Sequence, residues 1–286
     1  MNERAARALL FSAIEGGHPF WSSEISSHGG LATIERLQGG GYDGIKFHKL
    51  ISTLATTTAD QVLSAVDRAQ AQLLVPGDAL WPQGVEDLMA PPIALIVKGN
   101  PEVLTMQSLA IVGTRNPTNY GVRIAGDFAA GFVDREWGIV SGGAYGIDSS
   151  AHRGALIAEG VTIAVIASGI DVNYPAGNTR LFAEICETGA IITEVMPGHP
   201  ALPARFLTRN RLIAAISGAT LVIEAAFRSG SLRTARDAAE LLRPVMAIPG
   251  PINSPTSEGC HRLIGERAAE LVTSVADAVE FVGANR

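Results

Sequence analysis

The feature that most constrains the fold of this chain is a series of short apolar runs, most of which end at Gly or Pro. Seven runs lie at residues 73–77, 93–99, 109–113, 162–169, 190–195, 219–225 and 245–250, and the apolar segment at 138–140 is an eighth. From residue 109 onward, segments with apolar residues at helical spacing separate the runs. Runs that are apolar on both faces and alternate with helices are typical of a covered parallel sheet. The sequence therefore predicts an α/β, Rossmann-like fold with helices on both faces of the sheet.

Residues 1–70 have a different texture from the rest of the chain. Their apolar pattern is short and helical, and Thr58 to Gln61 form a capping box ahead of Val62 and Val66. A length of 286 residues leaves room for one large α/β domain and a smaller one. We therefore expect a small helical N-terminal domain over 1–70 and the Rossmann-like domain over 71–286.

Composition narrows the classes of function. The net charge of −6 gives no general attraction for polyanions, so a nucleic-acid site would have to be a local patch. Cys186 and Cys260 are far apart and outside any Cys/His cluster, which argues against a disulfide framework or a metal site and favours buried thiols. No eighteen apolar residues run together, and the N-terminus does not fit a signal peptide. We expect a cytoplasmic protein with no membrane partner.

Parallel sheets bind ligands at the carboxyl ends of their strands, so the loops after the apolar runs matter most. The first such loop contains Gly113, Thr114 and Arg115, which offer backbone donors, a hydroxyl and a cation. This combination suits an oxyanion, although a capped turn with a solvated arginine has the same residues.

The second loop, at residues 141–148, is rich in glycine. Gly142, Gly143 and Gly146 would let the backbone approach a phosphate, and Asp148 opens the next helix. The spacing is not GxGxxG, and no acidic residue stands at the usual ribose position, so we expect no nicotinamide cofactor. His152 follows within one turn, where a histidine contacts a ligand less often than it caps or packs.

Three later segments complete the set of candidates. Asn178 is placed to cap a helix, and nearby Tyr174 either stacks on a base or stiffens its loop. Residues 205–211 put three arginines and Phe206 directly before an apolar helix, as a sequence-tolerant single-strand contact requires; a solvated arginine turn is the other reading. The turn at Ser229 and Gly230 either holds a phosphate or caps a helix.

Six segments carry a resemblance to a known family. They are IVGTRNPTNYG, IVSGGAYGIDSSAHRGAL, SGIDVNYPAGNTRLF, TEVMPGHPALPARFLTRNRLIAAIS, LVIEAAFRSGSLRTARDAA and VMAIPG. In order and spacing the chain resembles the DprA (Smf) family of DNA-processing proteins over residues 73–264. The resemblance implies an extended Rossmann domain without a dinucleotide cofactor, single-stranded DNA binding, loading of the RecA recombinase and a homodimer. The implied role is natural transformation or recombination.

The resemblance also assigns roles to single residues. It implies that Arg115 contacts the DNA backbone, that the glycines and Asp148 of the second loop belong to the site, and that Arg209, Asn210 and Arg211 do too. The full expected DNA site is Gly113, Thr114, Arg115, Gly142, Gly143, Gly146, Asp148, Asn178, Phe206, Arg209, Asn210, Arg211, Ser229 and Gly230.

The chain departs from the family pattern at Tyr145, Ala176 and Leu207, and the first two replace cations. We expect these departures to weaken DNA binding. The sequence stops at Arg286, and we expect no C-terminal winged-helix domain of the kind found in longer members.

Two other classes of function stay open. One is a nucleotide hydrolase of the lysine-decarboxylase-like type, whose PGGxGTxxE mark is replaced here by SGSLRTA, with Glu224 ahead of it. The other is a nucleotide-sensing protein that binds a phosphorylated ligand without turnover. Because GxSxG, Walker and Cys/His motifs are lacking, we expect a binding protein and not an enzyme.

Overall fold

The computed structural model describes residues 1–42 and 46–284, and its centre is one mixed sheet. The strands are β1 (Gln72–Leu74), β2 (Leu95–Gly99), β3 (Ser108–Gly113), β4 (Gly138–Ser141), β5 (Thr162–Val165), β6 (Ala190–Thr193), β7 (Ala219–Ile223), β8 (Val245–Ala247) and β9 (Glu270–Leu271). Their order is β1-β2-β6-β5-β4-β3-β7-β8-β9. The predicted α/β fold is confirmed, and each apolar run contains a strand. The prediction missed the exposed β9 and the antiparallel pairing of β1 and β2.

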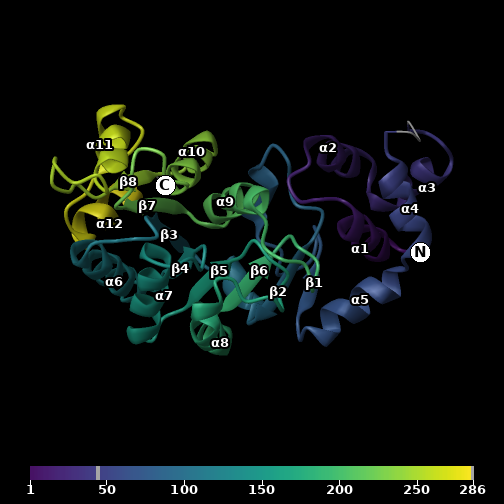
Figure 1. Cartoon of the computed structure of the whole chain (residues 1–286), viewed down its shortest axis with the longest axis horizontal. Helices are drawn as coiled ribbons and strands as arrows, with labels where there is room; N and C mark the ends of the chain where they lie inside the picture. The colour runs from purple at the N-terminus through teal and green to yellow at the C-terminus, as the bar shows by residue number, and fades with distance from the viewer. Residues whose placement is uncertain (43–45, 285–286) are drawn as a thin grey trace.

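Helices cover both faces of the sheet, as the apolar runs predicted. On β3, Leu109 and Ile111 pack toward α6 (Asn119–Val133) and α7 (Ile147–Ile157). Ala110 and Val112 alternate with them and belong to the core under α9 (Pro203–Ile216) and α10 (Ser231–Glu240). Figure 1 shows α9 and α10 above the sheet and α6, α7 and α8 (Thr179–Thr188) below it.

In the described part of the chain, five helices precede the sheet and lie beside its β1 edge (Figure 1). They are α1 (Glu3–Ala13), α2 (Pro19–His28), α3 (Gly30–Gln38), α4 (His48–Thr56) and α5 (Ala59–Arg68). Thr58 and Gln61 form the predicted capping box at the start of α5. One hydrophobic cluster joins Trp21 and Ile25 of α2 to Ile96 of β2. The N-terminal helices and this end of the sheet therefore share a core.

The remaining helices are α11 (Glu258–Gly265), α12 (Val275–Ala284) and three short 3-10 turns, η1 (Gln83–Asp87), η2 (Pro101–Thr105) and η3 (Ala176–Asn178). Over 1–42 and 46–284, no helix is long and apolar enough to cross a membrane, and no cluster of metal-binding side chains is found. Cys260 is buried as predicted, whereas Cys186 is only partly buried.

The strand order places a crevice at the centre of the sheet. From β3 the chain builds outward through β4, β5 and β6 in one direction, and β7 and β8 then line up on the other side of β3. Connections on opposite sides of a parallel sheet leave an opening at the carboxyl ends of the two central strands. The loops after β3 and β7 are joined there, because the Thr114 N–H donates to the Glu224 carbonyl at 2.7 Å.

Candidate nucleic-acid interface

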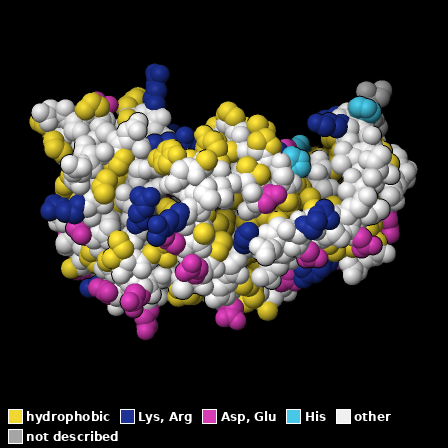
Figure 2. Space-filling model, turned by 60° about the horizontal axis from the view of Figure 1, so that its bottom comes forward, with side chains coloured by type: hydrophobic (Ala, Val, Ile, Leu, Met, Phe, Trp, Pro, Cys, Tyr) yellow, Lys and Arg dark blue, Asp and Glu magenta, His cyan; other side chains and the backbone are white. Residues whose placement is uncertain are grey.

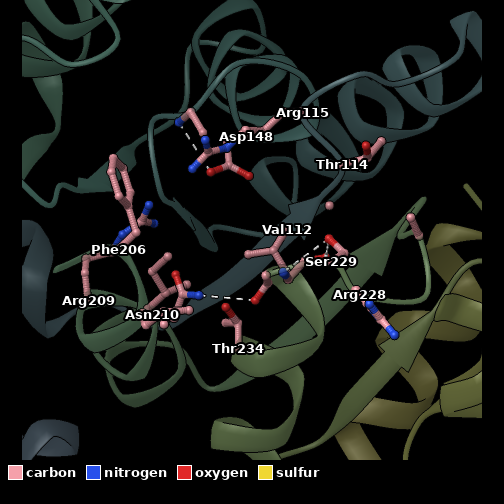
Figure 3. Close-up of a pocket in the computed structure, with 17 residues that line it drawn as sticks. Val112, Thr114, Arg115, Asp148, Phe206, Arg209, Asn210, Arg228, Ser229 and Thr234 are labelled. Atoms are coloured by element: carbon pink, nitrogen blue, oxygen red, sulfur yellow. Dashed lines mark hydrogen bonds between the residues drawn. The ribbon is translucent and has the colours of Figure 1, made fainter. Parts of the chain in front are cut away.

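A cavity of about 400 Å³ lies in this crevice (Figure 3). We call it the groove pocket. Five segments meet in its wall: the loops after β3, β4 and β7, and the first turns of α9 and α10. Its lining includes Gly113, Thr114, Arg115, Ala144, Asp148, Phe206, Leu207, Arg209, Asn210, Ala226, Arg228, Ser229, Gly230, Ser231 and Thr234. The structure thus brings together loops that the sequence singled out separately.

The loop after β3 is held by a buried carboxylate. Glu224, 6% exposed, accepts hydrogen bonds from the Thr118 N–H at 2.8 Å and the Thr118 hydroxyl at 2.5 Å. Gly121 faces the same carboxylate so closely that a Cβ there would overlap with it. The protein's own anion therefore occupies the start of α6, where a Rossmann fold usually holds a dinucleotide phosphate.

The glycines of the second loop allow close packing between protein segments. A Cβ on Gly142 would overlap with the guanidinium of Arg209, and a Cβ on Gly146 would overlap with the carbonyl of Thr114. Gly143 and Gly146 also have φ values of +67° and +84°, which favour glycine. The sequence predicted that a phosphate could approach the backbone at Gly142. In the structure the guanidinium of Arg209 occupies that space.

Arg209 forms a buried positive floor beside this loop. It is 7% exposed, and burial together with the nearby charge of Arg115 lowers its pKa to about 10, although Asp148 opposes this shift. The Asp148 carboxylate accepts from the Ala144 N–H at 3.3 Å, and burial raises the pKa of Asp148. At neutral pH Arg209 keeps its proton. Its Nε–H is buried and has no acceptor among the described residues.

Above this floor, Arg115 lies over an aromatic ring at the rim of the pocket. Its guanidinium carbon is 5.1 Å from the centroid of Phe206, whose ring lies 5.4 Å from that of Tyr174 with the planes inclined by 56°. Arg115 is exposed, and no carboxylate in the described ranges forms an ion pair with it. The rim therefore offers a cation for phosphate and aromatic faces for bases.

The opposite wall is the start of α10 (Figure 3). Gly230 stands at the N-cap without a side-chain cap, while the hydroxyls of Ser229 and Ser231 lie 2.7 Å apart. The Asn210 amide donates to the Gly230 carbonyl at 3.2 Å and fixes the turn against α9. Beside it Arg228 is exposed and forms no ion pair within the described chain. The helix dipole and a cation favour an anion at this wall.

Sequence reasoning singled out this turn but omitted Arg228 from the site. The signal was available, since Arg228 follows a buried strand and precedes a Gly-Ser helix start at the same sheet edge.

The structure places Arg211 away from the groove pocket. The segment 205–211 was interpreted as a turn before a helix, but α9 already begins at Pro203, so these residues are helical. Arg211 forms a buried ion pair with Glu194 and donates to the Ala90 carbonyl at 2.9 Å. The expectation of a DNA contact took no account of this partner. Proline at the first helical position was the missed signal.

Asn178 also has a different place from the expected one. It is 2% exposed, and its amide donates to the Gly143 carbonyl and the Ser149 hydroxyl, both at 2.9 Å. It stands at the N-cap of α8 but makes no side-chain cap bond there. Its side chain supports the second loop from below and does not line the groove pocket.

The structure also places Tyr145, one of the departures from the family pattern, and His152, for which two roles were open. The Tyr145 hydroxyl accepts from the Gly177 N–H at 3.2 Å, so this residue braces the neighbouring loop. His152 is fully buried, its Nδ1 lies 2.6 Å from the Thr162 hydroxyl, and burial lowers its pKa to about 3. His152 is a neutral packing residue.

Comparison with known proteins tests the resemblance. The family model described as DNA recombination-mediator protein A matches residues 72–283. A putative DNA processing protein DprA from Mycobacterium tuberculosis is 44% identical over 234 residues, and the match covers 77% of this chain. DNA processing protein DprA from Streptococcus pneumoniae is 41% identical over 202 residues, 71% of each protein. The chain spans about 60% of the length of the Mycobacterium relative.

Two solved structures are similar in fold as well. An X-ray structure of DNA processing protein A from Streptococcus pneumoniae has a TM-score of 0.76 and 36% identity, with 82% of this chain and 81% of that chain covered. A structure of the Helicobacter pylori protein, described as giving insight into its single-stranded DNA binding mode, has a TM-score of 0.67 and 29% identity, covering 74% and 96%. The predicted resemblance is confirmed: the chain belongs to the DNA recombination-mediator protein A family.

Proposed function

We propose that this chain binds single-stranded DNA along the groove pocket and acts as a DNA-processing protein in recombination or natural transformation. The observation that carries the proposal is the exposed Arg115, which lies unpaired over Phe206 at the rim of a pocket with a buried cation below. Charge for the backbone beside stacking faces for bases is what sequence-tolerant binding of a single strand requires.

The exposure of each side chain in the groove pocket suggests its role in binding. Arg115 and Arg228 are free to contact phosphates, and the dipole of α10 favours an anion beside Arg228. Phe206 and Tyr174 offer the stacking faces. We propose that Arg209 supplies positive potential from beneath and that Gly142, Gly143, Gly146, Asp148 and Asn178 hold the loops in position.

The alternative functions have less support. Glu224 is committed to Thr118, so it is a poor candidate for the catalytic acid of a nucleotide hydrolase. The acidic composition also agrees with a local site: on the face drawn in Figure 2, Lys and Arg form small separate groups. We therefore propose a binding role without catalysis.

Thermal shifts with two kinds of ligand test this proposal. Single-stranded oligonucleotides should raise the melting temperature of the purified chain more than mononucleotides at equal nucleotide concentration, because linked contacts bind tighter and stabilise the folded state. Turnover of a nucleotide, or stabilisation by mononucleotides alone, would contradict it.

Partners form a separate part of the proposal. As a member of its family, the chain is proposed to act as a homodimer that loads RecA onto DNA. Light scattering that gives only the 29.9 kDa monomer at micromolar concentration would refute the dimer. RecA nucleation on strands coated with single-strand binding protein should become faster when the chain is added. An unchanged rate would remove this role and leave DNA binding intact.

A further inference from the structure

A second cavity, of about 670 Å³, lies between the N-terminal helices and the loop after β6. We call it the basic cavity. Its walls come from the end of α1, from α2, from the start of α4, from the loop after β6 and from the first turn of α9. The charged and titratable residues of its lining include Glu15, His18, Lys46, Lys49, His199 and Arg205. The groove pocket takes no residue from the N-terminal helices, so the two are separate sites.

The charges of the basic cavity do not cancel. Its two carboxylates are each committed to an arginine, because Glu15 pairs with Arg205 and Glu194 pairs with Arg211. Lys49 is exposed and forms no ion pair within residues 1–42 and 46–284. An exposed ammonium beside neutralised carboxylates gives the cavity a local positive potential in an acidic protein.

Two histidines stand near this lysine. The Nδ1 of His18 accepts from a backbone N–H in the first turn of α2 at 3.5 Å, so its Nε2 carries the hydrogen of the neutral ring. Hydrogen bonds from Arg205 lower the pKa of Glu15 most, and the charges of His199 and Lys49 add to this effect. His199 and Lys49 therefore lie near the same carboxylate from opposite walls. Cations and an N–H donor that converge on one cavity suit the oxygens of a phosphate.

An intermediate cavity of about 300 Å³ lies between the basic cavity and the groove pocket. It shares Arg209 with the groove pocket, and it shares Glu15, Glu194, Val195 and Arg205 with the basic cavity. All three cavities have residues of α9 in their walls, and Figure 1 shows this helix between α10 and the N-terminal helices. A chain molecule in the groove pocket thus has a route across the start of α9 to the basic cavity.

We propose that the basic cavity binds backbone phosphates of a single strand whose neighbouring nucleotides occupy the groove pocket. Lys49 pairs with a phosphate, and the Nε2–H of His18 donates to it. A strand fits better than a compact phosphorylated ligand because adjoining cavities link two positive sites, and a polyanion with regularly spaced charges reaches both. This inference rests on the proposed function and extends it to the N-terminal helices.

Strand length separates the basic cavity from the groove pocket. A strand of about five nucleotides can occupy only the groove pocket, whereas one of about twenty also reaches the basic cavity. Each phosphate neutralised on a single strand contributes a slope of about −0.7 in log K against log salt concentration. The long strand should therefore be steeper than the short one by at least about 0.7. At about 0.15 M salt this one contact gives on the order of a fourfold gain in affinity.

The test measures both slopes by fluorescence anisotropy with labelled dT strands, for the wild type, Lys49→Gln and Lys98→Gln. Lys98 is the matched control, because it lies beside the start of β6 at the opposite edge of the sheet and lines neither cavity. We expect Lys49→Gln to lower the long-strand slope by about 0.7, to weaken long-strand binding about fourfold and to leave the short strand unchanged. Lys98→Gln should bind both strands like the wild type.

Acetylation of lysines, followed by mass spectrometry, locates the contact directly. The long strand should slow acetylation of Lys49 but not of Lys98, and the short strand should slow neither. Protection of Lys49 by thymidine monophosphate as strong as that by the long strand would show that the cavity takes a compact phosphorylated ligand, and would overturn the proposal.

The proposal is also overturned if Lys49→Gln binds the long strand as tightly and as steeply as the wild type and Lys49 is not protected. Binding of the short strand through the groove pocket would persist in that case. Failure of the proposed function looks different, since neither strand would then bind and the inference would fall with it.

Discussion

Two pairs of arginines at and beside α9 are in opposite situations. Arg205 contacts both carboxylate oxygens of Glu15, at 3.0 and 2.5 Å, and Arg211 pairs with Glu194. At the groove pocket, Arg209 has only the nearby charge of Asp148, and the exposed Arg115 beside it has no pairing carboxylate among the described residues. An arginine with an internal carboxylate partner anchors the helix, whereas an unpaired one is available for a ligand.

Arg211→Ala should give the largest difference between a paired and an unpaired arginine. It leaves the buried Glu194 without its partner, which costs about 3–5 kcal/mol in the free energy of unfolding. Urea denaturation measures the loss, and Arg115→Ala is the control, with an expected change within about 0.5 kcal/mol because its side chain is exposed. Equal losses in the two variants would show that the paired and the unpaired arginines do not differ in their contribution to stability.

Phe206→Ala tests the groove pocket. We expect it to weaken binding of single-stranded DNA by about 1–3 kcal/mol, because it removes a stacking surface. The salt dependence of binding should change little, since no charge is lost. Ile157→Ala, which removes an exposed apolar side chain on α7 outside the groove pocket, is the control. If Phe206→Ala instead lowers the unfolding free energy and leaves the affinity unchanged, the ring serves packing alone.

A smaller effect is expected from the pH dependence of the Glu15 pair. Hydrogen bonds from Arg205 hold the pKa of Glu15 below its ordinary value of 4.5, although burial opposes them. Because the folded pKa is the lower one, the pair stabilises the fold above pH 4.5, and this contribution disappears as the pH falls through the folded pKa. The Glu15 side chain is 67% exposed, so the contribution is under about 1 kcal/mol.

Unfolding free energies of the wild type and Glu15→Gln should therefore differ at pH 7 and converge as the pH falls through the folded pKa of Glu15. A difference that stays constant over this range would mean that the pair contributes nothing through its charge.

Much of the fold and the position of the pocket followed from local sequence signals. Runs apolar on both faces predicted the central strands, and the rule that ligands bind at strand carboxyl ends led to Thr114, Asp148 and Ser229, which line one cavity. Burial on both faces leaves few other structures for such runs.

The orientation of individual side chains was harder to predict. Arg209 and Arg211 are two residues apart, which on an α-helix separates them by about 200°, so they cannot share a face. Reading their segment as a turn concealed this difference. Asn178 and the glycines of the second loop depend on contacts with distant segments, such as Arg209 over Gly142, that no local pattern contains.

The salt dependence of single-stranded DNA binding tests the central claim most directly. Each phosphate neutralised on a single strand contributes a slope of about −0.7 in log K against log salt concentration. Arg115 and Arg228 are the two exposed cations in the lining of the groove pocket, and neither forms an ion pair with a described residue, so the wild type should give a slope of about −1.4 with a short labelled dT oligonucleotide. Arg115→Ala should reduce it to about −0.7 and weaken binding to all sequences alike. An affinity independent of salt, or an Arg115→Ala variant that binds as tightly and as steeply as the wild type, would contradict the account.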